Sequence, residues 1–254
     1  GFDPLSRPCR FMLTEEAHHM FVGETGVGRT IQATVEAMNK AGITDPTDVS
    51  RIRELGVIDL PTIQKKLNLH YSLSLDLFGQ EVSTNAANAF NAGIKGRYME
   101  TRIDDDHQLK NDTYVVRTVR DGAVVAEEVP ALTAINMRLR DDYIRDAAGG
   151  VGRWNKIIQK AGVDFELTLP DEAFHRQIGV FAAVQANPAG DLISQETWDA
   201  SVAQWLPTRA DGEFIQSLMK PVTEPGTYAS WIAAPKVGID SKPGDFEYVQ
   251  LHAA

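Results

Sequence analysis

Two overlapping Glu-x-x-His patterns stand near the start of the chain, in a segment that reads TEEAHH from position 14. Glu15 is followed three residues later by His18, and Glu16 by His19. A spacing of three places a carboxylate and an imidazole on one face of a helix, where both can bind the same metal ion. A single pair of this kind arises often by chance on an exposed helix, so the spacing alone is weak evidence for a metal site.

The residues around these pairs strengthen the hypothesis. Projected on a helix at about 100° per residue, Glu16 and His19 fall in one narrow stripe that is otherwise apolar or small, with Met12, Gly23 and Val27. A carboxylate and an imidazole in an apolar stripe need a partner, because an unpaired buried charge is very costly. A metal ion would be such a partner. The other pair lies in a second apolar stripe, so projection leaves both registers open.

Long helices are predicted to hold these residues. Apolar side chains at helical spacing predict a helix over residues 10–41, which Gly42 ends. A second long helix is predicted from Asp59 to about residue 96, with a short helix over 49–55 between the two. Helices of about 30 residues are typical of a long-helix bundle.

The later part of the chain has mixed patterns. Two β-branched runs flank Asp121-Gly122, and this arrangement predicts a β-hairpin over residues 113–130. The remaining patterns predict four helices, one short strand and an extended proline-rich tail, at residues 132–147, 152–161, 196–206 and 212–219, at 163–169, and at 221–254, respectively.

Composition limits the class of protein. The 254 residues include 35 acidic and 25 basic side chains, which give a net charge of -10, and Lys and Arg are not concentrated in any segment, so nucleic acid is not an expected partner. Cys9 is the single cysteine and cannot form an internal disulfide. No apolar run approaches the ~20 residues that cross a membrane. We expect a cytoplasmic protein of one or two domains, and the start at Gly1 instead of Met indicates a piece of a longer protein.

The segment FMLTEEAHHMFVGETGVGR, residues 11–29, closely resembles the metal-binding helix of the oxygenase component of benzoyl-CoA 2,3-epoxidase, a di-iron family with a ferritin-like bundle. The resemblance extends through RDGAVV in the hairpin region to the tail, and covers roughly the second half of that family's chain. It implies a mainly α fold. Residues 1–97 would form the C-terminal half of the di-iron bundle, and residues 98–254 a C-terminal extension with the hairpin, helices and a wrapping tail.

The resemblance also implies a ligand register. In related di-iron oxygenases an acidic residue precedes the ligand Glu, and a basic residue precedes the ligand His. This pattern makes Glu16 and His19 iron ligands, with Glu15 supporting an imidazole from another helix and His18 in the place usually held by Arg. The register with Glu15 and His18 as ligands stays open. The remaining ligands of the di-iron centre are expected upstream of Gly1.

The activity implied by the resemblance is the insertion of one atom of O₂ into the ring of benzoyl-CoA, during aerobic benzoate degradation. The expected partners are benzoyl-CoA, O₂, a separate NADPH-dependent reductase and the missing N-terminal half of the bundle. The isolated chain would hold only part of the site and would be inactive. Two alternatives stay open, namely a related di-iron oxygenase of another aryl-CoA, and a non-catalytic helical fragment or partner subunit.

Two further residues are candidates for a substrate pocket. Gly23 lies one turn beyond His19 on the same stripe, so its absent side chain could leave room for an aromatic ring. Close packing against a neighbouring helix is the alternative. His70, on the second long helix, could line the pocket or handle a proton, but it could also be an ordinary structural histidine.

Overall fold

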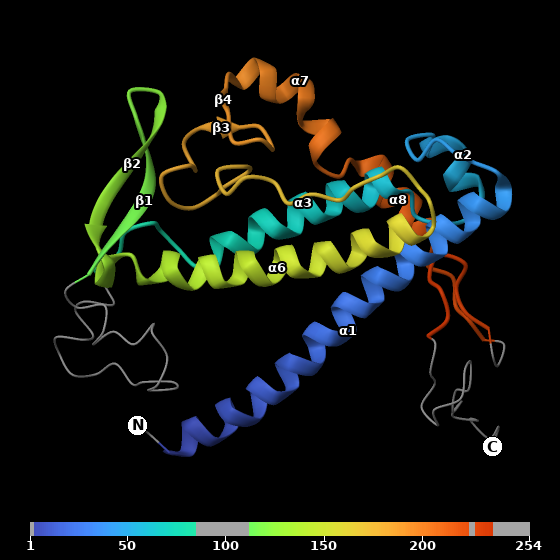
Figure 1. Cartoon of the computed structure of the whole chain (residues 1–254), viewed down its shortest axis with the longest axis horizontal. Helices are drawn as coiled ribbons and strands as arrows, with labels where there is room; N and C mark the ends of the chain where they lie inside the picture. The colour runs from blue at the N-terminus through green and yellow to red at the C-terminus, as the bar shows by residue number, and fades with distance from the viewer. Residues whose placement is uncertain (1–2, 85–111, 224–226, 236–254) are drawn as a thin grey trace. The chain divides into compact units, whose positions relative to one another are not determined.

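A computed structural model describes residues 3–84, 112–223 and 227–235 of the chain (Figure 1). The described part is mainly helical, with a β-hairpin and a second, shorter antiparallel strand pair, which confirms the predicted mainly α class with an added hairpin. The chain forms two compact units. We call them the α1 unit, made of Phe2–Gln64, Gly150–Leu167 and Pro207–Ala254, and the hairpin unit, which includes Lys65–Gly149 and Thr168–Leu206. The predicted domain boundary at residue 97 lies outside the described residues and stays a prediction.

The α1 unit is built on one long helix. Helix α1 spans Asp3–Ala41, α2 spans Val49–Glu54 and α8 spans Arg209–Leu218. The start of α3 (Leu60–Asp76) and the end of α6 (Ile135–Lys160) complete this unit. Its core is formed by apolar side chains from α1, α2, α3 and α6, namely Ile31, Val35, Met38, Ile52, Leu60 and Ile158. The helix predicted over residues 10–41 is therefore confirmed, and it begins seven residues earlier, at Asp3.

Arg53 joins three elements of the α1 unit. Its Nε donates to Oδ2 of Asp59, before α3, at 2.8 Å, and its Nη2 donates to Oδ1 of Asp211 on α8 at 2.5 Å. The guanidinium also lies 4.6 Å from the ring centre of Phe214. Burial alone would lower the pKa of Arg53, but the hydrogen bonds that its guanidinium donates to Asp59 and Asp211 outweigh this effect and raise the pKa above its usual value.

The hairpin unit carries the predicted β-hairpin. Strand β1 spans Thr113–Arg120 and pairs with antiparallel β2, Ala123–Pro130. Asp121 and Gly122 both have positive φ, 50° and 76°, so the two-residue turn is of the type that an Asp-Gly sequence favours. The unit also contains most of α3, the first part of α6 and four further elements, namely η1 (Ala131–Thr133), β3 (Gln185–Ala186), β4 (Leu192–Ile193) and α7 (Gln195–Trp205).

The predicted length of the second long helix is wrong. Helix α3 ends at Asp76, not near residue 96. The N–H groups of Leu77, Phe78 and Gly79 bond to carbonyls three residues back, and Gly79 has a φ of 83°, so the helix tightens and then turns away. The continuation predicted through positions 86–94 lies outside the described residues.

Two predictions for residues 132–169 are also wrong. Helix α6 is one continuous helix where two were predicted, and it runs through Gly149, Gly150 and Gly152. Burial of apolar side chains on both sides of these glycines, such as Met137 and Ile158, offsets their cost of about 1 kcal/mol each. Residues 163–169 form no strand, and the backbone N–H and C=O of Leu167 bond to the Asn155 side chain instead.

The other helices agree with prediction. The short helices predicted over 49–55, 196–206 and 212–219 are α2, α7 and α8, each within about three residues of the predicted bounds. In the part of the chain that the structure describes, no helix is both long enough and apolar enough to span a bilayer.

Candidate metal centre

Glu16 and His19 lie on the first half of α1, one turn apart. Oε2 of Glu16 is 3.5 Å from Nδ1 of His19, and each side chain is 62% exposed. The uninterrupted helix brings these two side chains together, as the spacing of three predicts. A carboxylate oxygen and an imidazole nitrogen at this separation can approach one cation from the same side, and both are donors that suit iron. The residues therefore fit one half of a metal site.

Glu15 and His18 lie on the same two turns and are also exposed. The described residues do not distinguish the two registers, because both pairs have helical spacing and the side chains of both are exposed. Across residues 3–84, 112–223 and 227–235, no three His, Cys, Asp or Glu side chains form a group that could hold a metal ion. The assignment of Glu16 and His19 as ligands, with Glu15 supporting them, stays a prediction.

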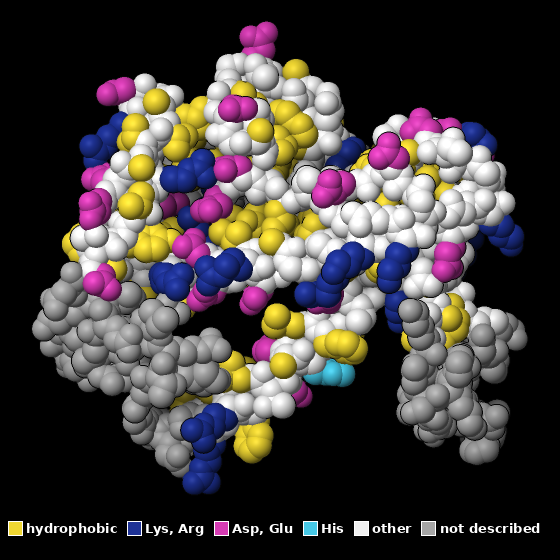
Figure 2. Space-filling view, in the orientation of Figure 1, with side chains coloured by type: hydrophobic (Ala, Val, Ile, Leu, Met, Phe, Trp, Pro, Cys, Tyr) yellow, Lys and Arg dark blue, Asp and Glu magenta, His cyan; other side chains and the backbone are white. Residues whose placement is uncertain are grey.

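Large apolar side chains surround these polar residues and are exposed. Figure 2 shows apolar and histidine side chains together along this half of α1. The exposed apolar residues point to several sides of the helix and are Leu5, Phe11, Met12, Leu13, Met20, Phe21 and Val22, with exposed fractions from 48% to 76%. A helix that is apolar on several sides normally lies inside a bundle. This half of α1 therefore has the surface of a buried helix, although its apolar side chains are exposed.

The two residues predicted to line a substrate pocket lie in different units. Gly23 is exposed on α1, and a Cβ atom built on it meets no heavy atom within 4 Å among the described residues. His70 is exposed on α3, in the hairpin unit. The roles of both residues stay predictions.

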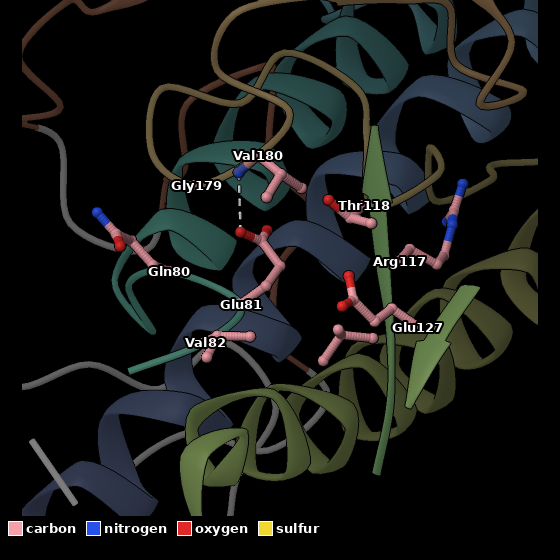
Figure 3. A pocket seen from close by; sticks show the side chains of 9 residues that line it. Gln80, Glu81, Val82, Arg117, Thr118, Glu127, Gly179 and Val180 are labelled. Carbon is pink, nitrogen blue, oxygen red and sulfur yellow. Dashed lines mark hydrogen bonds between the residues drawn. The ribbon is translucent and has the colours of Figure 1, made fainter. Parts of the chain in front are cut away.

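A pocket in the hairpin unit escaped prediction. It has a volume of about 360 Å³ and lies between β1, β2, the segment after α3 and the loop that contains Gly179. Figure 3 shows the Glu81 side chain reaching the loop, where Oε2 accepts a hydrogen bond from the N–H of Val180 at 2.9 Å. Gly179 has a φ of 86°, and a Cβ there would overlap the carboxylate of Glu81. Only glycine therefore fits beside this carboxylate.

Behind Glu81 lies a buried cluster of charges. Nε of Arg176 donates to Oδ1 of Asp76 at 2.6 Å, and Nη2 of Arg140 donates to Oε2 of Glu172 at 2.5 Å. Oε1 of Glu81 lies 3.7 Å and 3.9 Å from Nη1 of Arg140 and of Arg176, beyond hydrogen-bond distance. The two arginines face three carboxylates, so the cluster does not attract a further anion. We interpret it as a device that holds α3, α6 and the loop together.

His175 lies beside this cluster in a strained conformation. Its φ is 53°, its ring stacks on Trp198 with 6.1 Å between centroids, and its Nδ1 is 3.1 Å from the Ser72 hydroxyl. Burial lowers the pKa of the His175 imidazole, and the charge of Asp76 opposes this shift. The neutral imidazole is therefore the form that the folded state prefers.

The hairpin unit should consequently lose stability as the pH falls below about 6.5, the ordinary pKa of histidine. A lowered folded-state pKa means that the unfolded chain binds the proton first, so this contribution is present above pH 6.5 and is lost as the pH falls through the folded value. In urea unfolding followed by tryptophan fluorescence, the midpoint should drop more between pH 7.5 and 5.5 in the wild type than in His175→Asn. Asparagine tolerates the positive φ. Equal drops would contradict the prediction.

Comparison with known proteins relates this mainly helical chain to an oxygenase component. No family model matches it. It is 52% identical over 252 residues to Benzoyl-CoA oxygenase component B from Aromatoleum evansii, an alignment that covers 99% of this chain and 53% of the relative. The resemblance to this oxygenase family is therefore confirmed over the part that the chain spans. The chain spans about half the length of this relative, and the position of the matching half stays a prediction.

Proposed function

We propose that this chain is part of an oxygenase component that inserts one atom of O₂ into the ring of benzoyl-CoA at a di-iron centre. The proposal is supported by the name of the relative, by the identity of 52% over nearly the whole chain and by the Glu-x-x-His segment of α1. We call the longer polypeptide that would contain this chain and match the relative over its whole length the complete protein.

The observation that carries the proposal is the combination of donors and apolar surface on one half of α1. Glu16 and His19 present a carboxylate and an imidazole 3.5 Å apart, and the surrounding side chains are apolar and exposed. A di-iron carboxylate site in a helical bundle takes a Glu-x-x-His from each of two helices and a carboxylate from each of two others. One such helix stands among the described residues, and we propose that the other three come from the remainder of the complete protein.

In the complete protein, Glu16 and His19 would hold one side of the metal pair. The Glu15 carboxylate would accept a hydrogen bond from an imidazole on another helix and so fix the orientation of that ring. Iron, when bound, would supply the redox chemistry by which electrons from NADPH reduce O₂, so that one oxygen atom enters the ring and the other leaves as water. The word component in the relative's name supports a separate partner, and we propose an NADPH-dependent reductase in that role.

The activity is tested by mixing the complete protein with a reductase, NADPH and O₂, and by offering benzoyl-CoA beside a second aryl-CoA such as phenylacetyl-CoA. Oxygenation of benzoyl-CoA at the higher kcat/KM supports the proposal. A preference for the second thioester would favour the alternative of a related oxygenase. Iron loading without turnover of either thioester would contradict the assigned reaction.

The isolated 254-residue chain is expected to bind well below two irons per molecule and to show no NADPH-dependent oxygenation, even with reductase present. The reason is that, among the described residues, α1 is the only helix that carries a Glu-x-x-His pair, and no group of three metal ligands is formed. Metal analysis of the purified chain after iron addition checks the first expectation, and product analysis checks the second. Two tightly bound irons, or turnover of benzoyl-CoA by the chain alone, would refute the half-site interpretation.

Gly23→Leu in the complete protein is expected to keep the fold and the iron, but to lose oxygenation of benzoyl-CoA. The added side chain would enter the space beside the ligands, and NADPH would still be consumed without ring product. The checks are thermal unfolding, iron content and the ratio of product to NADPH. Loss of iron together with destabilisation of about 1–3 kcal/mol would instead show that Gly23 serves helix packing.

In the isolated chain Gly23→Ala should stabilise α1 by up to about 1 kcal/mol, because no described heavy atom lies within 4 Å of a Cβ built there.

A further inference from the structure

The α1 helix changes from exposed to packed at one place. Along α1 the described side chains are exposed as far as Gly23, and Glu24 is the first that is partly buried. Glu24 is five residues after His19 and eight after Glu16, which corresponds to about 7.5 Å and 12 Å along the helix axis. The predicted ligands therefore stand on a projecting arm whose base is at Glu24.

Helix α6 holds this base through three donors on two neighbouring residues. Nε and Nη2 of Arg153 each donate to one carboxylate oxygen of Glu24, the second at 2.6 Å. The indole Nε1 of Trp154 donates to the backbone carbonyl of Glu24 at 3.0 Å. A bidentate contact between a guanidinium and a carboxylate fixes the relative orientation of the two groups as well as their distance. The hydrogen bond from Arg153 also lowers the pKa of the Glu24 carboxyl, so the pair stays charged at neutral pH.

One turn further along α1, Gly28 allows α6 to come close. A Cβ built on Gly28 would lie 3.2 Å from Cδ1 of Ile157 and 3.6 Å from Cδ1 of Trp154. The absence of a side chain therefore lets the Trp154 ring lie against the helix while its N–H reaches Glu24. Arg29, the next residue, is held by the segment 227–235, since its Nε donates to the carbonyl of Ala233 at 2.7 Å and its own carbonyl accepts from the Ala233 N–H at 3.0 Å.

We infer that the contacts of Glu24 and Gly28 on α1 with Arg153 and Trp154 on α6, called the grip below, fix the direction of the first half of α1. They thereby position Glu16 and His19. This inference rests on the proposed function. The four residues are positioning residues, because they act on the ligands through the helix. A tilt of 5° at Glu24 would displace Glu16, about 12 Å away, by about 1 Å. Misplacement by that amount commonly costs about 10²-fold in rate.

The direction of the arm can be measured in the isolated chain without any metal. Cys9 is the single cysteine, is exposed and lies on the arm, so it accepts a spin label directly. A second label is placed on α6 by Gln159→Cys, at an exposed position of the same unit. Pulsed electron paramagnetic resonance then gives the distribution of distances between the labels. The variant Glu24→Ala/Trp154→Phe removes all three donated hydrogen bonds, places a good helix former on α1 and keeps an aromatic ring on α6.

We expect this variant to broaden the distance distribution at least about twofold, and the single variant Trp154→Phe to broaden it less. The control is Glu213→Ala, which removes the exposed pair between Arg209 and Glu213 on α8 of the same unit. An unchanged distribution in both the double and the single variant would overturn the inference. Circular dichroism verifies that each variant is helical. If the double variant does not fold, the distance distribution of the single variant Trp154→Phe tests the inference.

The link to the ligands is measured in the complete protein as the rate of iron release to a chelator. Release should be about 10–100-fold faster in Glu24→Ala/Trp154→Phe than in Glu213→Ala, the range typical of lost supporting contacts around metal ligands. Broadened distances with an unchanged release rate would overturn the positioning role. If the complete protein binds no iron at all, the proposed function fails, whereas the distance measurement still reports on the grip itself.

Discussion

Glu16→Ala or His19→Ala in the complete protein is expected to abolish iron loading at one position of the metal pair, whereas His18→Ala should keep most of the iron. The two ligand candidates share one helical stripe and lie 3.5 Å apart, while His18 points to another side of α1. Removal of a ligand leaves too few donors for that iron, but removal of an exposed histidine outside the stripe leaves the donor set intact. Iron content per protein and Mössbauer spectra of the loaded protein measure the effect.

Glu15→Ala should fall between these variants, with iron affinity or activity reduced by about 10–100-fold. It supports an imidazole in our assignment and does not bind iron directly. Equal loss of iron in His18→Ala and His19→Ala would show that the register is wrong. Full loss in Glu15→Ala and His18→Ala, with retention in the other two variants, would move the ligands to the alternative pair.

Asp76→Ala should destabilise the hairpin unit by about 3–5 kcal/mol. The Arg176 side chain is fully buried, and Oδ1 of Asp76 accepts from its Nε at 2.6 Å. Oδ2 of Asp76 also accepts from the backbone N–H of Gln177 at 3.0 Å. The substitution leaves a buried guanidinium and a backbone donor without this carboxylate. Urea unfolding of the chain, followed by tryptophan fluorescence, measures the change.

The matched control for this substitution is Asp199→Ala on α7, which removes an exposed carboxylate that accepts from Gln195 at 2.8 Å. It should change the free energy of unfolding by no more than about 0.5 kcal/mol, as surface substitutions usually do. A loss below about 1 kcal/mol in Asp76→Ala would mean that the remaining carboxylates, Glu81 among them, suffice to compensate Arg176.

The elements that the sequence predicts well are those whose signals are local. The Asp121-Gly122 pair determines the hairpin turn by backbone preference alone, and both residues have the positive φ that this turn needs. Helix α1 has a helical pattern long enough to outweigh three internal glycines. The end of α3 was mispredicted because apolar spacing continues past Gly79 in the sequence, although the backbone turns there.

The two-residue metal motif could be found from sequence because its members are neighbours on one helix. The grip on α1 could not, since Glu24 and Arg153 are separated by 129 residues and neither has a local pattern. The same holds for Asp76 and Arg176, which are 100 residues apart. Such pairs are created by packing, and only the structure shows that these charges meet.

The most direct test of the account is the location of iron in a crystal of the complete protein, by anomalous diffraction at the iron absorption edge. We expect two iron peaks, one of them bound by Glu16 and His19, with Glu15 next to an imidazole from another helix. Iron bound by Glu15 and His18, or no iron near α1 in a protein that oxygenates benzoyl-CoA, would contradict it.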